Sequence, residues 1–221
     1  MLNFENITKS YSNGNNKNII LDSVDISVKL NSISLIKGMS GVGKSTLLNI
    51  MGCLIKPDNG KLNFNGKTIS LLDNNEKFRL LNFSYVFQNF NLLPEFTVYE
   101  NLLIPAYINN LDINRIKKKA DDLLDYMNVE HLKESYPNLI SHGEKQRISF
   151  LRTLLGNQKI ILADEPTGNL DEINTKIILD LIVKINVELN YTFIIVSHDS
   201  NFDKISSNIY GIEKKKIVRY E

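Results

Sequence analysis

A run of nine residues, Gly38 to Thr46, has the residue types and spacing needed to bind phosphate groups. Its sequence, Gly-Met-Ser-Gly-Val-Gly-Lys-Ser-Thr, fits the pattern G-x-x-x-x-G-K-[ST]. In such a loop the backbone N–H groups point at the phosphates, and glycines let the backbone approach them closely. A lysine adds charge beside the β- and γ-phosphates, and a hydroxyl can bind Mg²⁺. The run therefore predicts nucleotide binding by Gly38, Met39, Ser40, Gly41, Val42, Gly43, Lys44, Ser45 and Thr46.

Two adjacent carboxylates, Asp164 and Glu165, follow the apolar run Ile160–Ala163. We expect that run to be a buried strand, and ligands of α/β proteins bind at the carboxyl ends of strands. One carboxylate can hold Mg²⁺ while the other accepts a proton from water. Acidic residues are common where a strand ends, but beside a phosphate-binding loop they favour a hydrolytic site.

Two further polar residues also follow predicted strands. His198 comes just after the apolar run Phe193–Val196 and should lie at the same sheet edge as Asp164. There it could contact a terminal phosphate, although an isolated histidine is more often a surface or capping residue. Gln88 follows the strand predicted at Phe83–Phe87 and, taken alone, is a loop glutamine.

The elements that must position these residues alternate between strands and helices. Residues 2–37 predict strands with a turn at Ser12–Asn18. Apolar strands alternating with helices imply an α/β fold with a mainly parallel sheet covered on both faces. The stretch from Gln88 to about Pro137 interrupts this alternation and predicts a helical subdomain, in which Pro105 stops or kinks one helix. Helices are predicted at residues 44–54, 113–127, 143–155 and 174–188.

The composition is that of an ordinary globular protein. The 221 residues include 26 Lys and Arg against 25 Asp and Glu, and this net charge of +1 argues against nucleic acid as the main partner. The single cysteine excludes a disulfide scaffold and a cysteine-based zinc site.

Neither a signal-peptide pattern nor an apolar run near the ~18 residues of a membrane span is present, so we expect a soluble cytosolic protein. The basic residues Arg115 and Lys117–Lys119 predict a solvated helix face.

The segment Ile140–Arg147 connects these separate observations. Its sequence, Ile-Ser-His-Gly-Glu-Lys-Gln-Arg, resembles the signature L-S-G-G-[EQ]-x-Q-R of ATP-binding cassette (ABC) ATPases. The other motifs of that family then appear in the expected order over essentially the whole chain. They are Tyr11, the loop Gly38–Thr46, Gln88, the signature Ser141–Glu144, the strand end Ile161–Glu165, the loop Gly168-Asn169-Leu170-Asp171, and His198.

The resemblance implies a fold and a domain organisation. The fold would be a P-loop NTPase (RecA-like) α/β core with a mainly parallel sheet, an N-terminal antiparallel β subdomain and an inserted helical subdomain. The whole chain, residues 1–221, would be a single ABC ATPase domain. The helical subdomain would occupy about residues 89–155.

The resemblance also implies roles for individual residues. Tyr11 would stack on adenine, the alternative being a strand aromatic in the core. Glu165 would be the general base that polarises the attacking water, and His198 would contact the γ-phosphate. The cofactors would be ATP and Mg²⁺. The catalytic residues would be Glu165, His198, Gln88 and Lys44, and the Mg²⁺ ligands Ser45, Gln88 and Asp164.

Members of this family sandwich two ATP molecules between head-to-tail subunits. Ser141 and Gly143, at the start of a helix, would therefore present donors to the ATP held by the other subunit. Asp171 would lie at the dimer interface. The implied partners are a second cassette, identical or different, and a separate transmembrane permease subunit. The chain would be peripheral, at the cytoplasmic side of the cell membrane.

One residue departs from the signature, because His142 stands where the first glycine is usual. A side chain there restricts φ and adds bulk beside the opposing phosphate. We expect a competent site. The alternative is a weak half-site in an asymmetric heterodimer.

Two segments, Pro166–Asp171 and Leu92–Leu102, resemble one branch of the family. That branch includes the ATPases of lipoprotein release, macrolide-type export and the cell-division ABC complex, and it disfavours import. A non-transport ABC ATPase acting on DNA or the ribosome is the alternative, but such proteins usually carry two cassettes, coiled coils or zinc modules. A P-loop kinase or GTPase would need neither the signature nor the His198 loop.

Overall fold

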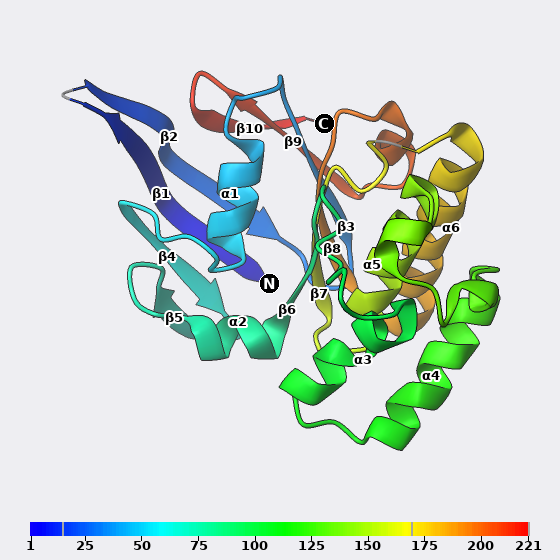
Figure 1. Ribbon diagram of the computed structural model, residues 1–221. Coiled ribbons are helices and arrows are strands. Elements are labelled where there is room, and N and C mark those ends of the chain that lie inside the picture. Colours follow the sequence, from blue (N-terminus) through cyan, green and yellow to red (C-terminus); the bar gives the residue numbers. More distant parts are fainter. Residues whose placement is uncertain (15, 169, 221) are drawn as a thin grey trace.

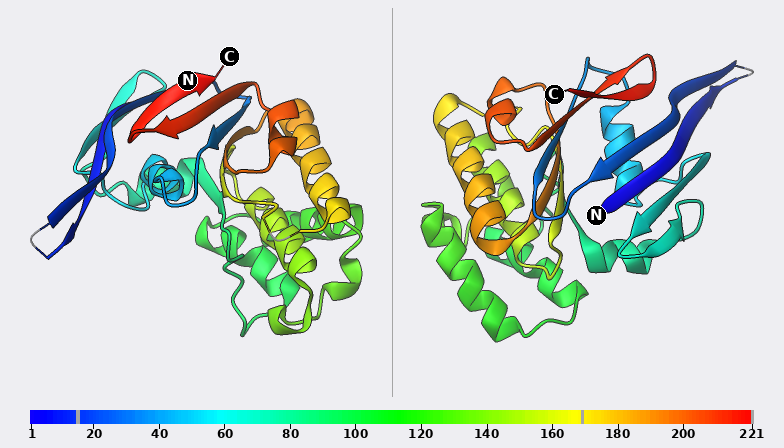
Figure 2. Two further views of the ribbon diagram at one scale, coloured as in Figure 1. Left: turned by 90° about the horizontal axis from the view of Figure 1, so that it is seen from above. Right: turned by 180° about the vertical axis from the view of Figure 1, so that it is seen from behind.

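Two β-sheets and a set of helices make up the structure (Figure 1), a computed structural model that describes residues 1–14, 16–168 and 170–220. The six-stranded sheet lies in the middle of the molecule. The four-stranded sheet lies to one side of it, and the helices α3 to α6 lie to the other (Figures 1 and 2). The glycine-rich loop Gly38–Gly43 therefore joins the central sheet to a helix placed between the two sheets.

The four-stranded sheet is antiparallel and has the order β2-β1-β4-β5. It confirms the predicted N-terminal β subdomain. The turn between the first two strands is shorter than the predicted Ser12–Asn18, because the pairing of the strands continues to Asn13 and Asn16. The strands are β1 (Leu2–Asn13), β2 (Asn16–Val28), β4 (Asn59–Phe64) and β5 (Lys67–Ser70).

The six-stranded sheet has the order β10-β9-β3-β8-β7-β6. Its strands are parallel except for β10, which pairs antiparallel with β9. This arrangement confirms the predicted mainly parallel sheet, and it brings the carboxyl ends of β3, β7 and β8 to one edge. The strands are β3 (Ile33–Lys37), β6 (Phe83–Val86), β7 (Ile160–Asp164), β8 (Thr192–Val196), β9 (Asn208–Glu213) and β10 (Lys216–Tyr220).

The central strands β3, β7 and β8 are mostly apolar because both of their faces are buried. Ile161 and Phe193 belong to the core on the side of the helices, whereas Leu162 and Ile194 belong to the core shared with the antiparallel sheet. Each fully buried side chain of this size contributes about 1.5–3 kcal/mol to folding. Helix α1 (Lys44–Met51) packs into the second core, so the loop before it is anchored between the two sheets.

The helical block consists of α3 (Val98–Ile108), α4 (Ile113–Tyr126) and α5 (His142–Leu154), with the 3₁₀ turns η1 (Glu130–Leu132) and η2 (Pro137–Leu139). Pro105 was predicted to stop or kink this helix; helix α3 continues through it, so a stop is wrong, whereas a kink stays a prediction. Proline removes one backbone donor, but the apolar residues on either side of it, Leu102 and Ala106, are fully buried.

The remaining helices frame the site. Helix α6 (Glu172–Leu189) covers the central sheet, and η3 (Ser200–Lys204) follows β8. The short helix α2 (Glu76–Asn82) had no sequence signal, because none of its residues is buried.

On α4, Arg115, Lys117 and Lys118 are exposed, while the Lys119 Nζ donates to the Leu154 carbonyl at 2.5 Å. Among the described residues, no helix is long and apolar enough to cross a membrane.

Candidate active site

The glycine-rich loop connects β3 to α1, and its backbone conformation depends on glycine at Gly43. This residue has a φ of 111°, and a Cβ there would lie 2.7 Å from the Ile20 Cγ2 atom. Lys44 is almost fully buried, and its Nζ donates to the carbonyls of Gly38 (2.8 Å) and Met39 (2.9 Å). The ammonium group is therefore held against the concave side of its own loop, where a phosphate would compete with these carbonyls for it.

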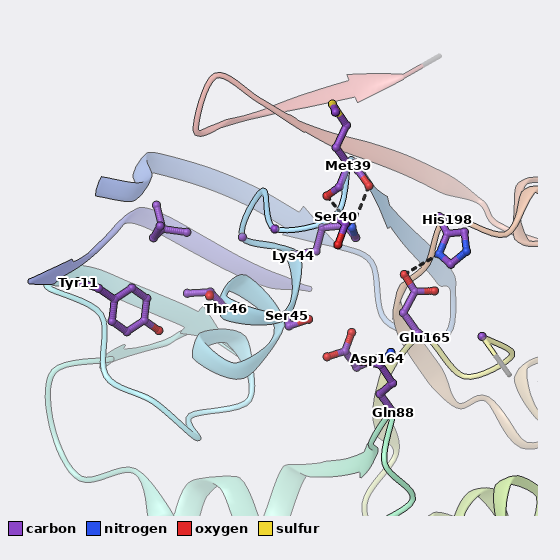
Figure 3. A pocket seen from close by; sticks show the side chains of 15 residues that line it. Tyr11, Met39, Ser40, Lys44, Ser45, Thr46, Gln88, Asp164, Glu165 and His198 are labelled. Carbon is purple, nitrogen blue, oxygen red and sulfur yellow. Dashed lines mark hydrogen bonds and ion pairs between the residues drawn. The ribbon is translucent and has the colours of Figure 1, made fainter. Parts of the chain in front are cut away.

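The loop forms one wall of a cleft of ≈ 610 Å³ (Figure 3). The residues predicted to act on the chain's own nucleotide line this cleft, with the exception of Val42, whose side chain packs against the second core. Ser141 and Gly143, which were predicted to act on another subunit's nucleotide, do not line it, and neither does Asp171, which was predicted to lie at the dimer interface. The cleft is lined by Tyr11, Ile20, Gly38, Met39, Ser40, Gly41, Gly43, Lys44, Ser45, Thr46, Gln88, Asp164, Glu165, Gly168 and His198.

Asp164, the last residue of β7, lies beside Ser45 in the cleft (Figure 3). Burial raises the pKa of its carboxyl, the Ser45 hydroxyl lowers it, and the charge of Glu165 raises it further. The Oδ1 atom is buried and has no hydrogen-bond partner among the residues that the structure describes. A buried carboxylate oxygen that lacks a partner and lies beside a hydroxyl is suited to a hard cation such as Mg²⁺.

Glu165 is fixed at both its backbone and its carboxylate. Its φ of 46° is in the left-handed region, and its N–H donates to the Val196 carbonyl at 2.8 Å. One carboxylate oxygen accepts from the Ser197 hydroxyl (3.0 Å), and the other lies 3.0 Å from the His198 Nδ1. The Glu165 side chain is 13% exposed and that of His198 is 73% exposed, so the carboxylate is sheltered while the ring faces the cleft.

Ser197 was not among the residues predicted for the site. It is fully buried, and it follows a run of five buried strand residues in which a serine gives no sequence signal for a role in the site. Its contact with Glu165 depends on β7 and β8 being neighbours in the sheet, which the structure shows.

Two residues reach the cleft from other elements. Tyr11, on β1, is 48% exposed, so it is not the core aromatic of the alternative interpretation. The Lys9 Nζ lies 5.2 Å from its ring centroid. Gln88 is exposed and follows β6, the strand next to β7. The cleft thus has an exposed aromatic ring at one end and a group of polar side chains at the other (Figure 3).

The start of α5 lies outside the cleft. Ser141 caps the helix: its hydroxyl accepts from the Glu144 N–H (3.3 Å), and a Glu144 carboxylate oxygen accepts from the Ser141 N–H (2.7 Å). The hydrogen bonds from Ser141 lower the pKa of Glu144. Next to it, a Cβ on Gly143 would lie 3.1 Å from the Asn174 Nδ2, which leaves little room for a side chain.

Asp171 caps the neighbouring helix α6 and joins it to this region. Its Oδ1 accepts from the Asn174 N–H at 2.7 Å, and the Asn174 side chain donates to the same carboxylate. The capped starts of α5 and α6 thus meet at one place on the surface. Of the predicted loop Gly168–Asp171, Asn169 lies outside the described residues.

A family model described as "ABC transporter" matches residues 21–168 of the chain. The chain belongs to the ABC transporter family. This finding confirms the resemblance drawn from the signature, and it makes the chain an ATP-binding, ATP-hydrolysing subunit of an ABC transporter. The family match also overturns the alternatives of a P-loop kinase or GTPase.

Similar ABC proteins match over nearly the whole chain. The lipoprotein-releasing system ATP-binding protein LolD of Buchnera aphidicola subsp. Schizaphis graminum is 39% identical over 201 residues, which are 90% of this chain and 88% of the relative. The ABC transporter ATP-binding protein YtrE of Bacillus subtilis is 38% identical, over 96% of this chain and 94% of its own length. The branch of the family named from the sequence is thus among these relatives.

Solved ABC cassettes share the fold. A dimeric structure of the cassette MJ0796 in a post-hydrolysis state, bound to ADP and Pi, superposes with a TM-score of 0.91 and 34% identity over 100% of this chain and 98% of that one. The predicted P-loop NTPase fold is therefore confirmed, with its antiparallel β subdomain and its helical block.

Proposed function

We propose that this ABC ATPase hydrolyses Mg-ATP at a site shared by two cassettes and transmits the resulting motion to a separate transmembrane permease subunit. One observation carries the proposal. One cleft brings together Lys44, Asp164, Glu165 and His198. Ser141 lies outside that cleft, and the start of its helix is free to face another molecule.

Within the cleft, Tyr11 stacks on the adenine and Lys44 neutralises the β- and γ-phosphates. Backbone N–H groups of the loop bind the same phosphates. Glu165 polarises the attacking water, because its carboxylate is sheltered and is oriented by two neighbours. His198 contacts the γ-phosphate through the part of its ring that faces the cleft.

We assign Mg²⁺ binding to Ser45, Gln88 and Asp164. Bound Mg²⁺ supplies neutralisation of charge on the β- and γ-phosphate oxygens. The hydroxyl, amide and carboxylate oxygens of these residues are the kind of donors that Mg²⁺ would require. In the described part of the chain, no group of three or more His, Cys, Asp or Glu side chains could hold a metal ion.

The second half of each site comes from the other cassette. Ser141 and Gly143 cap the γ-phosphate held by the partner, and Asp171 lies at the interface. The dimeric form of the related cassette MJ0796 supports this arrangement.

The chain acts as one domain, residues 1–221, with a helical subdomain at about 89–155.

We propose that the permease binds on the side of the Gln88 segment and the helical block, and that it holds the chain at the cytoplasmic side of the cell membrane. The relatives named as parts of a lipoprotein-releasing system support an export or mechanical role for the complex.

The variant Glu165→Gln tests the proposal. It removes the base but keeps the shape of the side chain, so hydrolysis should fall at least about a hundredfold. ATP binding should persist and yield a stable dimer in gel filtration with light scattering. A matched control is Glu188→Gln, at an exposed glutamate near the end of α6. Near wild-type hydrolysis by Glu165→Gln would refute the assignment of the base.

A further inference from the structure

The backbone of His142 does not need the glycine that its position usually holds. His142 is the first residue of α5 and does not have a positive φ. The restriction of φ expected from the sequence therefore has no consequence here. What remains is the imidazole ring, which is on the exposed surface beside Ser141 and Gly143.

The direction of a helical side chain determines where this ring could go. Each Cα–Cβ bond of a helix is tilted toward the helix N-terminus. A ring on the first residue of α5 can therefore swing over the backbone donors at the helix start. Those donors are the groups proposed to bind the partner's γ-phosphate, so a freely rotating ring would obstruct them.

In the structure the ring is instead placed against Phe90. The two ring centroids lie 5.5 Å apart, and the ring planes make an angle of 78°. This edge-to-face arrangement is a favourable geometry for an aromatic pair. Phe90 comes from the segment that follows Gln88, so the contact joins two segments that are distant in the sequence.

Phe90 is itself held in place by α5. Its φ is 61° and that of Asn91 is 49°, so two successive non-glycine residues have left-handed backbone conformations. The Phe90 carbonyl accepts from the Ser149 hydroxyl (3.0 Å) and from Arg152 (2.9 Å). Arg152 also donates to the Asn91 carbonyl at 2.7 Å. Such a conformation persists only where its surroundings fix it, and here α5 supplies three hydrogen bonds.

We propose that Phe90 is a positioning residue for the composite ATP site: its ring holds the His142 ring away from the start of α5 and so keeps the Ser141 end open to the partner's nucleotide. The proposal rests on the proposed two-cassette site. It explains how a chain with histidine in the signature retains a usable half-site.

The test is a double-mutant cycle between Phe90 and His142 in the Glu165→Gln background. The measured quantity is the ATP concentration that gives half-maximal dimer in light scattering. Phe90→Leu keeps an apolar side chain but loses the ring, and it should raise this concentration about fivefold. With His142→Gly also present, the same substitution should change it less than about twofold, because no ring remains to be held. Phe90→Tyr keeps the ring pair and should resemble the parent.

A purely structural role for Phe90 predicts a different result, since the loss would then be equal with and without His142. Equal losses would overturn the positioning role while leaving the two-cassette site intact. Absence of any ATP-dependent dimer in the parent would instead overturn the two-cassette site itself.

A second variant covers the case in which Phe90→Leu does not fold. His142→Gln retains bulk on an exposed residue but cannot form the ring pair, so it should raise the half-maximal ATP concentration about fivefold. His142→Gly removes the bulk. In the protein that keeps Glu165, and can therefore hydrolyse ATP, this substitution should change ATPase activity less than about tenfold. If His142→Gln behaved like the parent, the ring pair would have no positioning role.

Discussion

Glu165 Oε1 lies 3.0 Å from His198 Nδ1, although the two residues follow different strands. Glu165 comes directly after β7 and His198 two residues after β8, and these strands are paired in parallel. The neighbouring Ser197 hydroxyl donates to the other oxygen of the same carboxylate. The Glu165 carboxylate, which we propose as the general base, is therefore oriented by two side chains from one loop, so its alignment should be sensitive to either.

Replacing Ser197 with alanine should lower kcat about tenfold and leave KM for ATP nearly unchanged. The reason is that the hydroxyl bonds to a carboxylate, and the loss of such a bond costs about 1.5–3 kcal/mol. A steady-state ATPase assay over a range of ATP concentrations measures both constants. Ser34→Ala is a matched control, because Ser34 is equally buried on β3 and its hydroxyl has no hydrogen-bond partner within the described part of the chain. Equal activity of the two variants would show that Ser197 does not orient the base.

Tyr11 should contribute to nucleotide affinity through its ring. Stacking of a base on an aromatic side chain is worth about 1–3 kcal/mol, so Tyr11→Ala should weaken ATP binding about tenfold. Tyr11→Phe keeps the ring and should bind like the wild type. Titration calorimetry in the Glu165→Gln background measures the affinity without hydrolysis. Tyr107→Ala, at an exposed tyrosine on α3 outside the cleft, is the control, and an equal affinity of both alanine variants would exclude stacking.

The central sheet and the cleft were predictable because both rest on local patterns. Buried parallel strands are continuous apolar runs, and the phosphate loop, the acidic pair and His198 each follow one of them. Helix α2 buries no residue, so it lacks the apolar stripe that would reveal it.

Contacts between segments far apart in the sequence were not predictable. The roles of Ser197 and Phe90 depend on which strands and helices are neighbours, and their residue types carry no signal of their own. Of the predicted stop or kink at Pro105, the stop was wrong for a related reason, since burial of the surrounding helix outweighs one lost hydrogen bond.

Lys44→Ala should weaken ATP binding at least about tenfold, because the ammonium group is the cationic side chain that lines the phosphate end of the cleft. Its present bonds to the Gly38 and Met39 carbonyls show that it already lies along the loop. The binding of a fluorescent ATP analogue measures the effect. The control is Lys37→Ala: this lysine precedes the same loop but pairs with Asp203 at 2.8 Å. A Lys44→Ala protein that bound ATP as tightly as this control would contradict the role of the ammonium group.

Asp164→Asn should abolish hydrolysis and yet raise the stability of the nucleotide-free protein. Burial raises the pKa of Asp164 in the folded state, whereas the unfolded value is about 3.9. The folded state is therefore stabilised relative to the unfolded state by protonation, and ionisation of Asp164 at neutral pH costs stability. Asparagine does not ionise, so the variant should melt at a higher temperature at pH 7.5.

The sign of the pH dependence follows from the same shift. The stability gain from Asp164→Asn should be full above the raised folded pKa and should shrink as the pH falls toward about 3.9, where the wild-type carboxyl is protonated in both states. Melting curves without Mg²⁺ or nucleotide, recorded from pH 7.5 down to about pH 4, measure this trend. Asp125→Asn, at an exposed carboxylate on α4, serves as the control. A gain that grew toward acidic pH, or an Asp164→Asn protein less stable than the wild type at pH 7.5, would contradict the idea that this carboxylate carries an uncompensated buried charge until a cation binds.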